Sequence, residues 1–334
     1  MSRQKLGQHF LSQASWRTRI AETLPVERDA IWLEIGAGHG EMTEFLATRA
    51  RRVIAIETDA ALASALRKRA GHSPATANLS VNMGSSAKAV EFPATSGWPN
   101  VEVVHTDILS LDLADLVRRF ATNDSRQGTV FYTDAGSATV PKDAPMREAL
   151  GPEARLKAGK PVNASASHDR FRVYGNLPYY ITSPILSHLF RFADLIDSIH
   201  IVTQLEVAQR IAAHPRSRDY GYLSTLCQFY AHPELVFRIP PGAFQPPPKV
   251  TSALIEMHLP GERAALGIRD EHSFLKFLQT CFAHKRKTLR NNLRGTYAHD
   301  AVAKALAAGA LTDKSRAEEL TLHQFAQIFR SLAA

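Results

Sequence analysis

The sequence Ile31-Trp-Leu-Glu-Ile35 is a short apolar run, and it continues directly into Gly36-Ala-Gly-His-Gly40. A run of this length and composition, with Ala30 before it, is typical of a buried strand in a parallel sheet. Gly36 and Gly38 permit a tight turn and a close approach of the backbone to a ligand, which the next helix faces with its N-terminus. The stretch therefore predicts the first strand, loop and helix of a nucleotide-type binding site.

Further apolar runs of the same kind follow along the chain, and segments with a helical pattern connect the first three runs. Helical patterns at residues 41–50 and 60–70 separate the first three runs from one another. The order is strand, helix, strand, helix, strand, which predicts a doubly wound, Rossmann-like α/β sheet. The expected strands after residues 30–35 are 52–56, 101–105, 171–174 and 199–203.

Two acidic residues stand where the second and third expected strands end. Glu57 comes 21 positions after Gly36, a spacing at which an acidic side chain commonly binds ribose hydroxyls. Asp107 ends the third strand, where a carboxylate can accept a hydrogen bond from an adenine amino group. Each alone is equally well explained as a solvated carboxylate at a strand end, and the glycine spacing also suits an NAD dehydrogenase.

The fourth strand favours a different chemistry, because Tyr174-Gly-Asn-Leu-Pro-Tyr-Tyr180 places an amide, a proline and aromatic rings at its carboxyl end. The exocyclic amine of adenine is a poor nucleophile, since its lone pair is delocalised into the ring. Acceptors that hold its N–H groups direct that lone pair at a methyl donor. The Asn176 side chain and the backbone carbonyl of Leu177 or Pro178 are the candidate acceptors, with Tyr179 stacking on a flipped base. Alone, the motif is better explained as an Asn-Pro turn with core tyrosines.

Two long stretches interrupt the α/β pattern, at about residues 71–100 and 121–169. They are rich in Gly, Pro, Ser, Thr, Ala and Asn, and they greatly exceed the usual length of a connection, so they are predicted to be insertions. Strands are expected at 235–239 and 252–258, around a Pro-rich turn. Beyond Gly261 the pattern is helical, at 273–293, 301–308 and 322–332. We therefore expect a methyltransferase-type domain over residues 1–260 and a small α-helical domain over 261–334.

The segment from Cys281 to Arg294 carries five Lys or Arg residues and no acid. On one continuous helix, Arg286, Arg290 and Arg294 align at i, i+4 and i+8 outside an apolar stripe. Phosphates attract such a row of cations, although a charge run by itself is more often a solvated face. The candidate RNA-binding residues are Lys285, Arg286, Lys287, Arg290 and Arg294; the inward stripe is Phe274, Leu278, Cys281, Phe282, Leu289 and Leu293.

The composition agrees with a polyanionic partner. The chain has 334 residues, 40 Lys plus Arg against 32 Asp plus Glu, and a net charge of +8. Only two cysteines are present and the histidines show no ligand spacing, so neither a disulfide scaffold nor a metal site is expected. The sequence shows no apolar run long enough to span a membrane and no signal peptide, and a soluble, cytoplasmic monomer is expected.

Several motifs occur together in an order that resembles the KsgA-type small-subunit ribosomal RNA adenine-N6,N6-dimethyltransferases. Members of that family transfer methyl groups from S-adenosylmethionine to two adjacent adenosines near the 3′ end of small-subunit (16S) rRNA, in a pre-ribosomal particle. The resemblance covers most of the chain apart from the two insertions. The motifs are Lys5-Leu-Gly-Gln-His-Phe-Leu11, Glu34-Ile-Gly-Ala-Gly38, Asn176-Leu-Pro-Tyr179 and Phe244-Gln-Pro-Pro-Pro-Lys-Val-Thr-Ser252.

By position, the resemblance implies an S-adenosylmethionine site and a catalytic group at Asn176, Leu177, Pro178 and Tyr179. Family members have Asn or His where this chain has His9, commonly Pro at Ala37, and frequently Asn at Tyr180. The insertion at 121–169 is the main departure, since the family has a much shorter connection there. The implied cofactor contacts are His9, Leu11, Gly36, Glu57, Asp107 and Asn176.

Two other functions remain as alternatives. A large-subunit rRNA adenine methyltransferase of the macrolide-resistance type shares the expected fold, but typically has Ile in place of Leu177. A catalytically idle ribosome-assembly factor is the second alternative, and the presence of Gly36, Glu57, Asp107 and Asn176 argues against it. A DNA adenine methyltransferase more often has Asp in place of Asn176.

Overall fold

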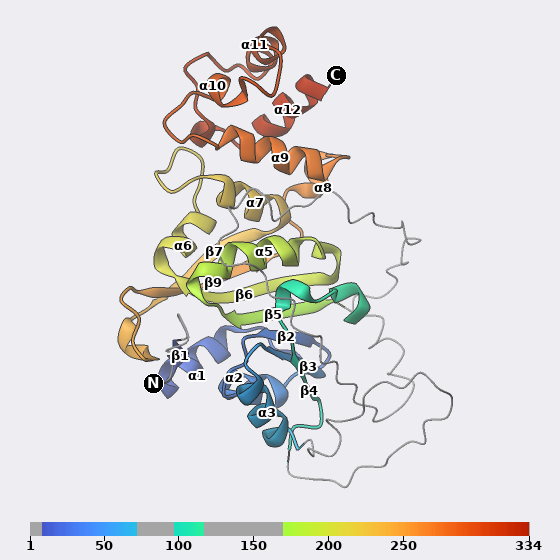
Figure 1. Cartoon of the computed structure of the whole chain (residues 1–334), viewed down its shortest axis with the longest axis vertical. Helices are drawn as coiled ribbons and strands as arrows, with labels where there is room; N and C mark the ends of the chain where they lie inside the picture. Colours follow the sequence, from blue (N-terminus) through green and yellow to red (C-terminus); the bar gives the residue numbers. More distant parts are fainter. Residues whose placement is uncertain (1–8, 72–96, 117–169, 334) are drawn as a thin grey trace, which may run out of the picture.

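The computed structural model describes residues 9–71, 97–116 and 170–333, and in this part of the chain seven strands form one sheet (Figure 1). The five strands that run from β4 to β6 across the sheet are parallel to one another. Beside β6, the strand β9 is antiparallel to both of its neighbours, β6 and the edge strand β7. The strands, in order across the sheet, are β4 (Val101–His105), β3 (Arg52–Glu57), β2 (Ile31–Ile35), β5 (Phe171–Asn176), β6 (Ile196–Gln204), β9 (Ser252–His258) and β7 (His232–Ile239).

The strand order reverses between β2 and β5. From β2 the chain builds outward through β3 to β4, and it then returns to the other side of β2 with β5 and β6. In open parallel sheets, ligands bind outside the carboxyl ends of the strands at such a switch point. The fold therefore places any cofactor site where β2 meets β5.

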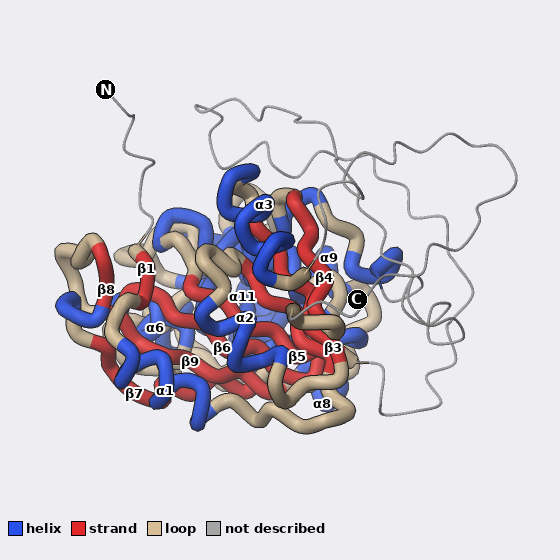
Figure 2. The backbone as a smooth tube through the Cα atoms, turned by 90° about the horizontal axis from the view of Figure 1, so that it is seen from below, coloured by secondary structure: helices blue, strands red, loops and turns tan. Residues whose placement is uncertain are grey.

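Alternate side chains of the strands enter two separate apolar clusters, because successive residues of a strand point to opposite faces. Trp32, Val53 and Val103 pack with helices α1 (Ala14–Thr23), α2 (Glu41–Ala47) and α3 (Ala60–Arg69). Leu33 and Ile54 belong to the cluster on the other face. Figure 2 shows α1, α2 and α3 on the viewer's side of the strands. The helices that contribute to the cluster on the other face include α5 (Thr182–Phe190), α6 (Leu205–Ile211) and α7 (Tyr222–Tyr230).

The chain after β9 is helical, and its buried side chains join the cluster under α5 and α7. Phe274 on α9 contacts the ring of Phe229 on α7, with 5.4 Å between their centroids, so the C-terminal helices are seated directly on the α/β part. Among the described residues, no helix is long and apolar enough to cross a membrane. The C-terminal helices are α8 (Arg263–Leu266), α9 (Glu271–Cys281), α10 (Leu289–Leu293), α11 (His299–Ala308) and α12 (Leu322–Ala333).

The strands and the first two helices expected from the sequence are confirmed, and so are the strands on either side of the Pro-rich turn. The sequence did not predict the small antiparallel pair of β1 (Phe10–Leu11) and β8 (Phe244–Gln245), which fastens the N-terminal segment to the Pro-rich turn. The predicted insertions lie outside the described residues, apart from Gly71 and residues 97–100 of the first.

The prediction of a single helix over residues 273–293 was wrong. Helix α9 ends at Cys281, and Thr288 begins α10 by accepting a hydrogen bond from the backbone N–H of Asn291 at 3.3 Å. The buried Asn292 side chain donates to the carbonyls of Cys281 (2.6 Å) and His284 (3.3 Å). These bonds satisfy backbone groups at the end of one helix and the start of the next, so two helices and a turn replace one helix.

Candidate active site

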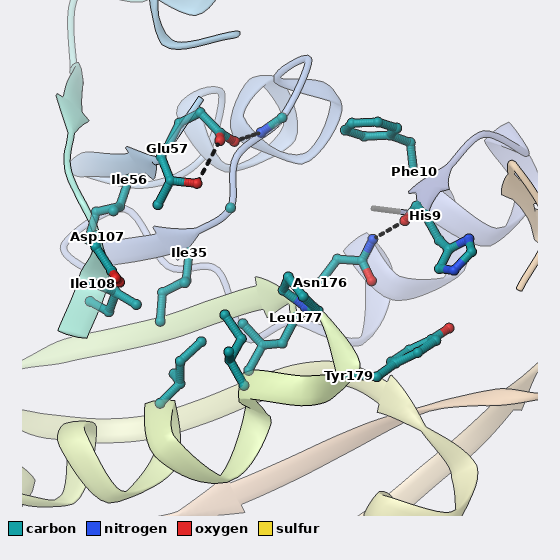
Figure 3. Close-up of a pocket in the computed structure, with 16 residues that line it drawn as sticks. His9, Phe10, Ile35, Ile56, Glu57, Asp107, Ile108, Asn176, Leu177 and Tyr179 are labelled. Carbon is teal, nitrogen blue, oxygen red and sulfur yellow. Dashed lines mark hydrogen bonds between the residues drawn. The ribbon is translucent and has the colours of Figure 1, made fainter. Parts of the chain in front are cut away.

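A pocket opens at the carboxyl ends of β2, β3 and β5, at the switch point of the sheet (Figure 3). Counted with the space that opens to solvent, its volume is about 750 Å³. In Figure 3, Glu57, Asp107 and isoleucines lie on one side, and Asn176, Tyr179 and His9 on the other. The lining residues are His9, Phe10, Ile35, Gly36, Gly38, Ile56, Glu57, Thr58, Asp107, Ile108, Asn176, Leu177, Pro178, Tyr179, Ile181 and Ile185.

The glycine loop after β2 is bonded to the buried carboxylate of Glu57. Gly36 and Gly38 have φ angles of +72° and +60°, which glycine adopts without the steric cost that a Cβ brings. The Glu57 Oε2 accepts from the backbone N–H of Gly38 at 2.9 Å, and its Oε1 accepts from that of Asp59 at 2.8 Å. Glu57 is 3% exposed and lines the pocket, and these two bonds fix the direction of its carboxylate.

Asp107 stands at the end of β4 beside an apolar wall. Its Oδ1 accepts from the backbone N–H of Leu109 at 2.9 Å, which begins a short 3-10 helix over Ile108–Ser110. The side chains of Ile56 and Ile108 flank the carboxylate in the pocket (Figure 3). A flat aromatic ring with an N–H on its edge fits a slot of this kind.

Asn176, the last residue of β5, is held by the N-terminal segment. Its Nδ2 donates to the backbone carbonyl of His9 at 2.9 Å, so the side-chain oxygen is the atom left to accept from a ligand. Gly175 lets β5 pack closely against β2, because any other residue at this position would place its Cβ only 3.1 Å from the Ile35 carbonyl oxygen. Leu177 is buried and donates its backbone N–H to the Val202 carbonyl at 3.0 Å. The turn therefore presents Asn176 at a defined place in the pocket.

Tyr179 is the aromatic wall of the same half of the pocket. Its ring stacks on His9, with 5.7 Å between centroids and 26° between planes, and its hydroxyl lies 2.9 Å from the Ser252 Oγ. Burial raises the pKa of Tyr179, against the opposing effect of the Ser252 hydrogen bond, so the phenol stays protonated. The His9 Nδ1 in turn bonds the Pro246 carbonyl at 2.7 Å. Two distant parts of the sequence thus orient this ring.

Most residues expected in the cofactor site line the pocket, but Leu11 does not. Its side chain is buried in the cluster under α1, and its backbone pairs with Phe244 of β8. Phe10 occupies the pocket wall instead, and its ring lies 3.2 Å from where a Cβ on Gly38 would stand. Sequence reasoning missed Phe10 and Ser252 as contributors to the site, although both belong to motifs that it singled out.

Glu34 lies on β2 and is buried, and no described cation forms an ion pair with it. Thr43 donates a hydrogen bond to its carboxyl group at 2.5 Å. Burial raises the pKa of Glu34 to about 8, with the Thr43 bond opposing and the nearby Glu41 and Glu57 adding to the rise. The carboxyl is therefore protonated in the folded protein at neutral pH.

Glu34 predicts a fall in stability with rising pH, because the unfolded chain releases a proton that the folded chain keeps. The contribution of the protonated Glu34 to the free energy of unfolding is complete below the ordinary pKa of 4.5. It is lost between there and pH 8, at about 1.4 kcal/mol per pH unit. Glu34→Gln keeps the shape of the side chain but cannot ionise. Between pH 6 and 8 the free energy of unfolding of this variant should therefore fall by about 2 kcal/mol less than that of wild type. Urea unfolding at both pH values measures the difference, and equal losses would contradict the buried neutral acid.

The predicted RNA-binding residues lie on the turn between α9 and α10 and on α10 itself, rather than along one helix. Arg286 and Lys287 are exposed on the turn, and Arg294 is exposed where α10 ends. Lys285 donates from Nζ to the Arg218 carbonyl at 2.7 Å. Arg290 pairs with Asp313 and contacts His299, so its guanidinium already has partners. The apolar stripe is buried as expected, except for Phe282, which is half-buried.

The comparisons with known proteins agree with this site. The family model for ribosomal RNA adenine dimethylase matches residues 1–83 and 85–334. A protein of Koribacter versatilis called ribosomal RNA small subunit methyltransferase A is 37% identical over 98% of this chain and 93% of its own length. One of the same name from Acidobacterium capsulatum is 35% identical, over 98% and 90%.

Two solved structures have the same fold. A dimethyladenosine transferase from Plasmodium falciparum has a TM-score of 0.60 at 19% identity, over 97% of this chain and 98% of its own. The 23S rRNA methyltransferase ErmE has a TM-score of 0.56 at 24% identity, over 97% of this chain and 100% of its own. At these identities the likeness concerns the Rossmann-like architecture alone.

Proposed function

Since the chain belongs to the ribosomal RNA adenine dimethylase family, we propose that it transfers methyl groups from S-adenosylmethionine to N6 of two adjacent adenosines in small-subunit rRNA. The products are N6,N6-dimethyladenosines in the 3′-terminal loop of that RNA. The observation that carries this proposal is the Asn176 amide. One of its two N–H donors is bonded to the His9 carbonyl, and among the described residues its Oδ1 accepts no hydrogen bond and lines the pocket.

The pocket residues fit S-adenosylmethionine. The buried Glu57 carboxylate suits the two ribose hydroxyls, and the Asp107 carboxylate between Ile56 and Ile108 suits an adenine ring with its amino group. Gly36 and Gly38 leave room for the backbone to approach the ligand. When bound, S-adenosylmethionine supplies an electrophilic methyl group on a sulfonium. We assign no side-chain contact to Leu11.

The residues of β5 and its turn would orient the target base. The Asn176 Oδ1 accepts one N–H of the adenine amine, and the backbone carbonyl of Leu177 or Pro178 accepts the other. Both bonds localise the nitrogen lone pair and direct it at the methyl group. Tyr179 stacks on the flipped base, with its hydroxyl fixed by Ser252. No strong base is needed, because the methylated nitrogen is acidic and gives its proton to water.

Primer extension on rRNA from cells with and without this gene tests the proposal. Dimethyladenosine blocks reverse transcription, so we expect two adjacent stops in the 3′-terminal loop of small-subunit rRNA that disappear with the gene and return with a plasmid copy. Stops that depend on the gene in large-subunit rRNA would instead identify the macrolide-resistance type of activity. Identical stops in both strains would overturn the proposal.

We further propose that the enzyme acts in the cytoplasm as a monomer on a pre-ribosomal particle. The bacterial relatives are named for small-subunit RNA, and the charge of +8 favours a large polyanion over a free nucleoside. We propose a domain boundary near residue 260, after the last strand of the sheet and before the C-terminal helices. Residues 1–260 would carry the chemistry, and 261–334 part of the RNA contact.

The exposed cations around α10 predict a measurable salt dependence. Replacing Arg286, Lys287 and Arg294 with Gln removes three charges and no buried contact, so thermal stability should stay within a degree. The slope of log affinity against log salt for the small subunit should fall by about 0.7–0.9 per phosphate contact, or about two in total. Arg290 is left intact because Asp313 pairs with it. An unchanged slope would show a solvated surface only.

A further inference from the structure

We propose that the loop between α6 and α7, at residues 214–219, is a second RNA-binding element that forms one cationic surface with the turn at residues 284–287. This inference rests on the proposed function, since it names a further part of the surface that holds the RNA substrate. Composition did not single out the loop, because its two arginines, Arg216 and Arg218, stand among polar residues. Only the tertiary structure brings it beside the basic turn.

The two segments are fastened to one another. The Lys285 Nζ donates to the backbone carbonyl of Arg218 at 2.7 Å. Tyr220, buried at the end of the loop, contacts the ring of Phe282 at the start of the turn, with 6.0 Å between their centroids. Figure 1 shows the loop after α6 and the turn after α9 on the left side of the molecule, the side that also carries β1.

Backbone hydrogen bonds hold the loop at residues 214–219 in a defined conformation. The backbone N–H of Arg216 donates to the carbonyl of Glu318 at 2.7 Å, and that of Ser217 donates to the carbonyl of His214 at 3.1 Å. Arg216 has a φ of +70°, a conformation that glycine adopts more easily than a residue with a Cβ. The Arg216 residue is exposed.

The charge of the combined surface is strongly positive. Its exposed cations are Arg216, Arg218, Lys285, Arg286 and Lys287, and its one exposed acid is Asp219. In the described part of the chain, no carboxylate forms an ion pair with either loop arginine. Glu318, whose backbone carbonyl binds the N–H of Arg216, has its carboxylate paired with Arg316 at 3.6 Å. Unpaired arginines beside lysines are suited to phosphates, which they bind through bidentate hydrogen bonds.

The position of the loop fits an RNA strand that enters the pocket. Val202 of β6 pairs with Asn176, and α6 begins three residues later at the same edge of the sheet. Helix α6 therefore connects the end of β6, next to Asn176, to the loop at residues 214–219. An RNA strand whose target base enters the pocket has further phosphates on either side of that base, and the loop is suited to bind some of them.

The test compares Arg216→Gln/Arg218→Gln with wild-type enzyme on small subunits from cells that lack this gene. We expect the slope of log affinity against log salt to fall by about 1.4–1.8. If the affinities converge at 1 M salt, that slope corresponds to roughly 20- to 60-fold weaker binding at 0.1 M. The matched control is Arg49→Gln/Lys68→Gln, which removes one exposed cation from the turn after α2 and one from α3 and should leave the slope unchanged.

Other variants keep the test decisive. Arg216→Gly/Arg218→Gln suits the backbone at residue 216, so it replaces the Gln pair if that variant is unstable. Lys285→Gln should cost less binding in the Arg216/Arg218 variant than in wild type, because the lysine acts partly by holding the loop. An unchanged slope in a folded, methylating loop variant overturns the inference alone. Absence of methylation by wild type overturns the proposed function instead.

Discussion

Asn176→Ala should lower the rate of methyl transfer at saturating substrates by a factor of about 100 or more. The substitution removes the acceptor that holds the target amine, and it also frees the His9 carbonyl that Asn176 binds. Affinity for the small subunit should change little, because the cationic surface supplies most of it. Single-turnover transfer of labelled methyl groups, with subunit affinity measured in parallel, gives both values.

Asn176→Asp separates the two roles of the amide. A carboxylate keeps an acceptor for the amine, but it repels the His9 carbonyl instead of donating to it. We expect an activity between those of wild type and Asn176→Ala, with the His9 segment less firmly held. Near-normal single-turnover rates in Asn176→Ala would remove this residue from the chemistry.

Glu57→Ala should weaken S-adenosylmethionine binding by tenfold or more. Each hydrogen bond from a ribose hydroxyl to a charged acceptor is worth about 1.5–3 kcal/mol, and the carboxylate also holds the glycine loop through Gly38. Methyl transfer should be restored in part by excess cofactor, since the acceptor group of Asn176 is untouched. Calorimetric titration with the cofactor measures the change, and an unchanged affinity would place the ribose elsewhere.

Glu57→Gln is the sharper variant, because the two oxygens of Glu57 accept from two backbone N–H groups, those of Gly38 and Asp59. A glutamine has only one side-chain oxygen, so its NH₂ group must face one of these donors. We therefore expect Glu57→Gln to bind cofactor much less well than wild type, although the two side chains have nearly the same shape. Equal binding would show that the loop does not depend on the carboxylate.

The fold class could be predicted from local signals. Each parallel strand is a short apolar run that is buried on both faces, as the residues of β2 show, so its pattern survives in the sequence without its neighbours. The helix over 273–293 could not be predicted correctly by the same means. Its apolar spacing is real and its side chains are buried, but Thr288 and Asn292 divide it by satisfying backbone groups. Helical spacing records which side chains face inward and is insensitive to such a break.

Local sequence signals also predicted part of the candidate site, namely the residues at the ends of strands. Gly36, Glu57, Asp107 and Asn176 each lie at or just after the carboxyl end of a strand. Parallel strands bring these ends to one edge of the sheet, so spacing alone grouped the four residues. Phe10 and Ser252 reach the site through contacts between segments far apart in the chain. Similarly, the partners of Arg290 and Lys285 lie 23 and 67 positions away.

The sequence by itself determined the α/β class, the family resemblance, the glycine loop and the acidic and amide groups of the pocket, because these depend on local pattern and strand order. The tertiary structure alone decided which atom of Asn176 faces the ligand, which cations stay free for RNA, and that Arg216 and Arg218 stand beside the basic turn. The physical reason is that hydrogen bonds and ion pairs between distant segments depend on relative position to within an ångström or so. Residue spacing along a chain carries no such information.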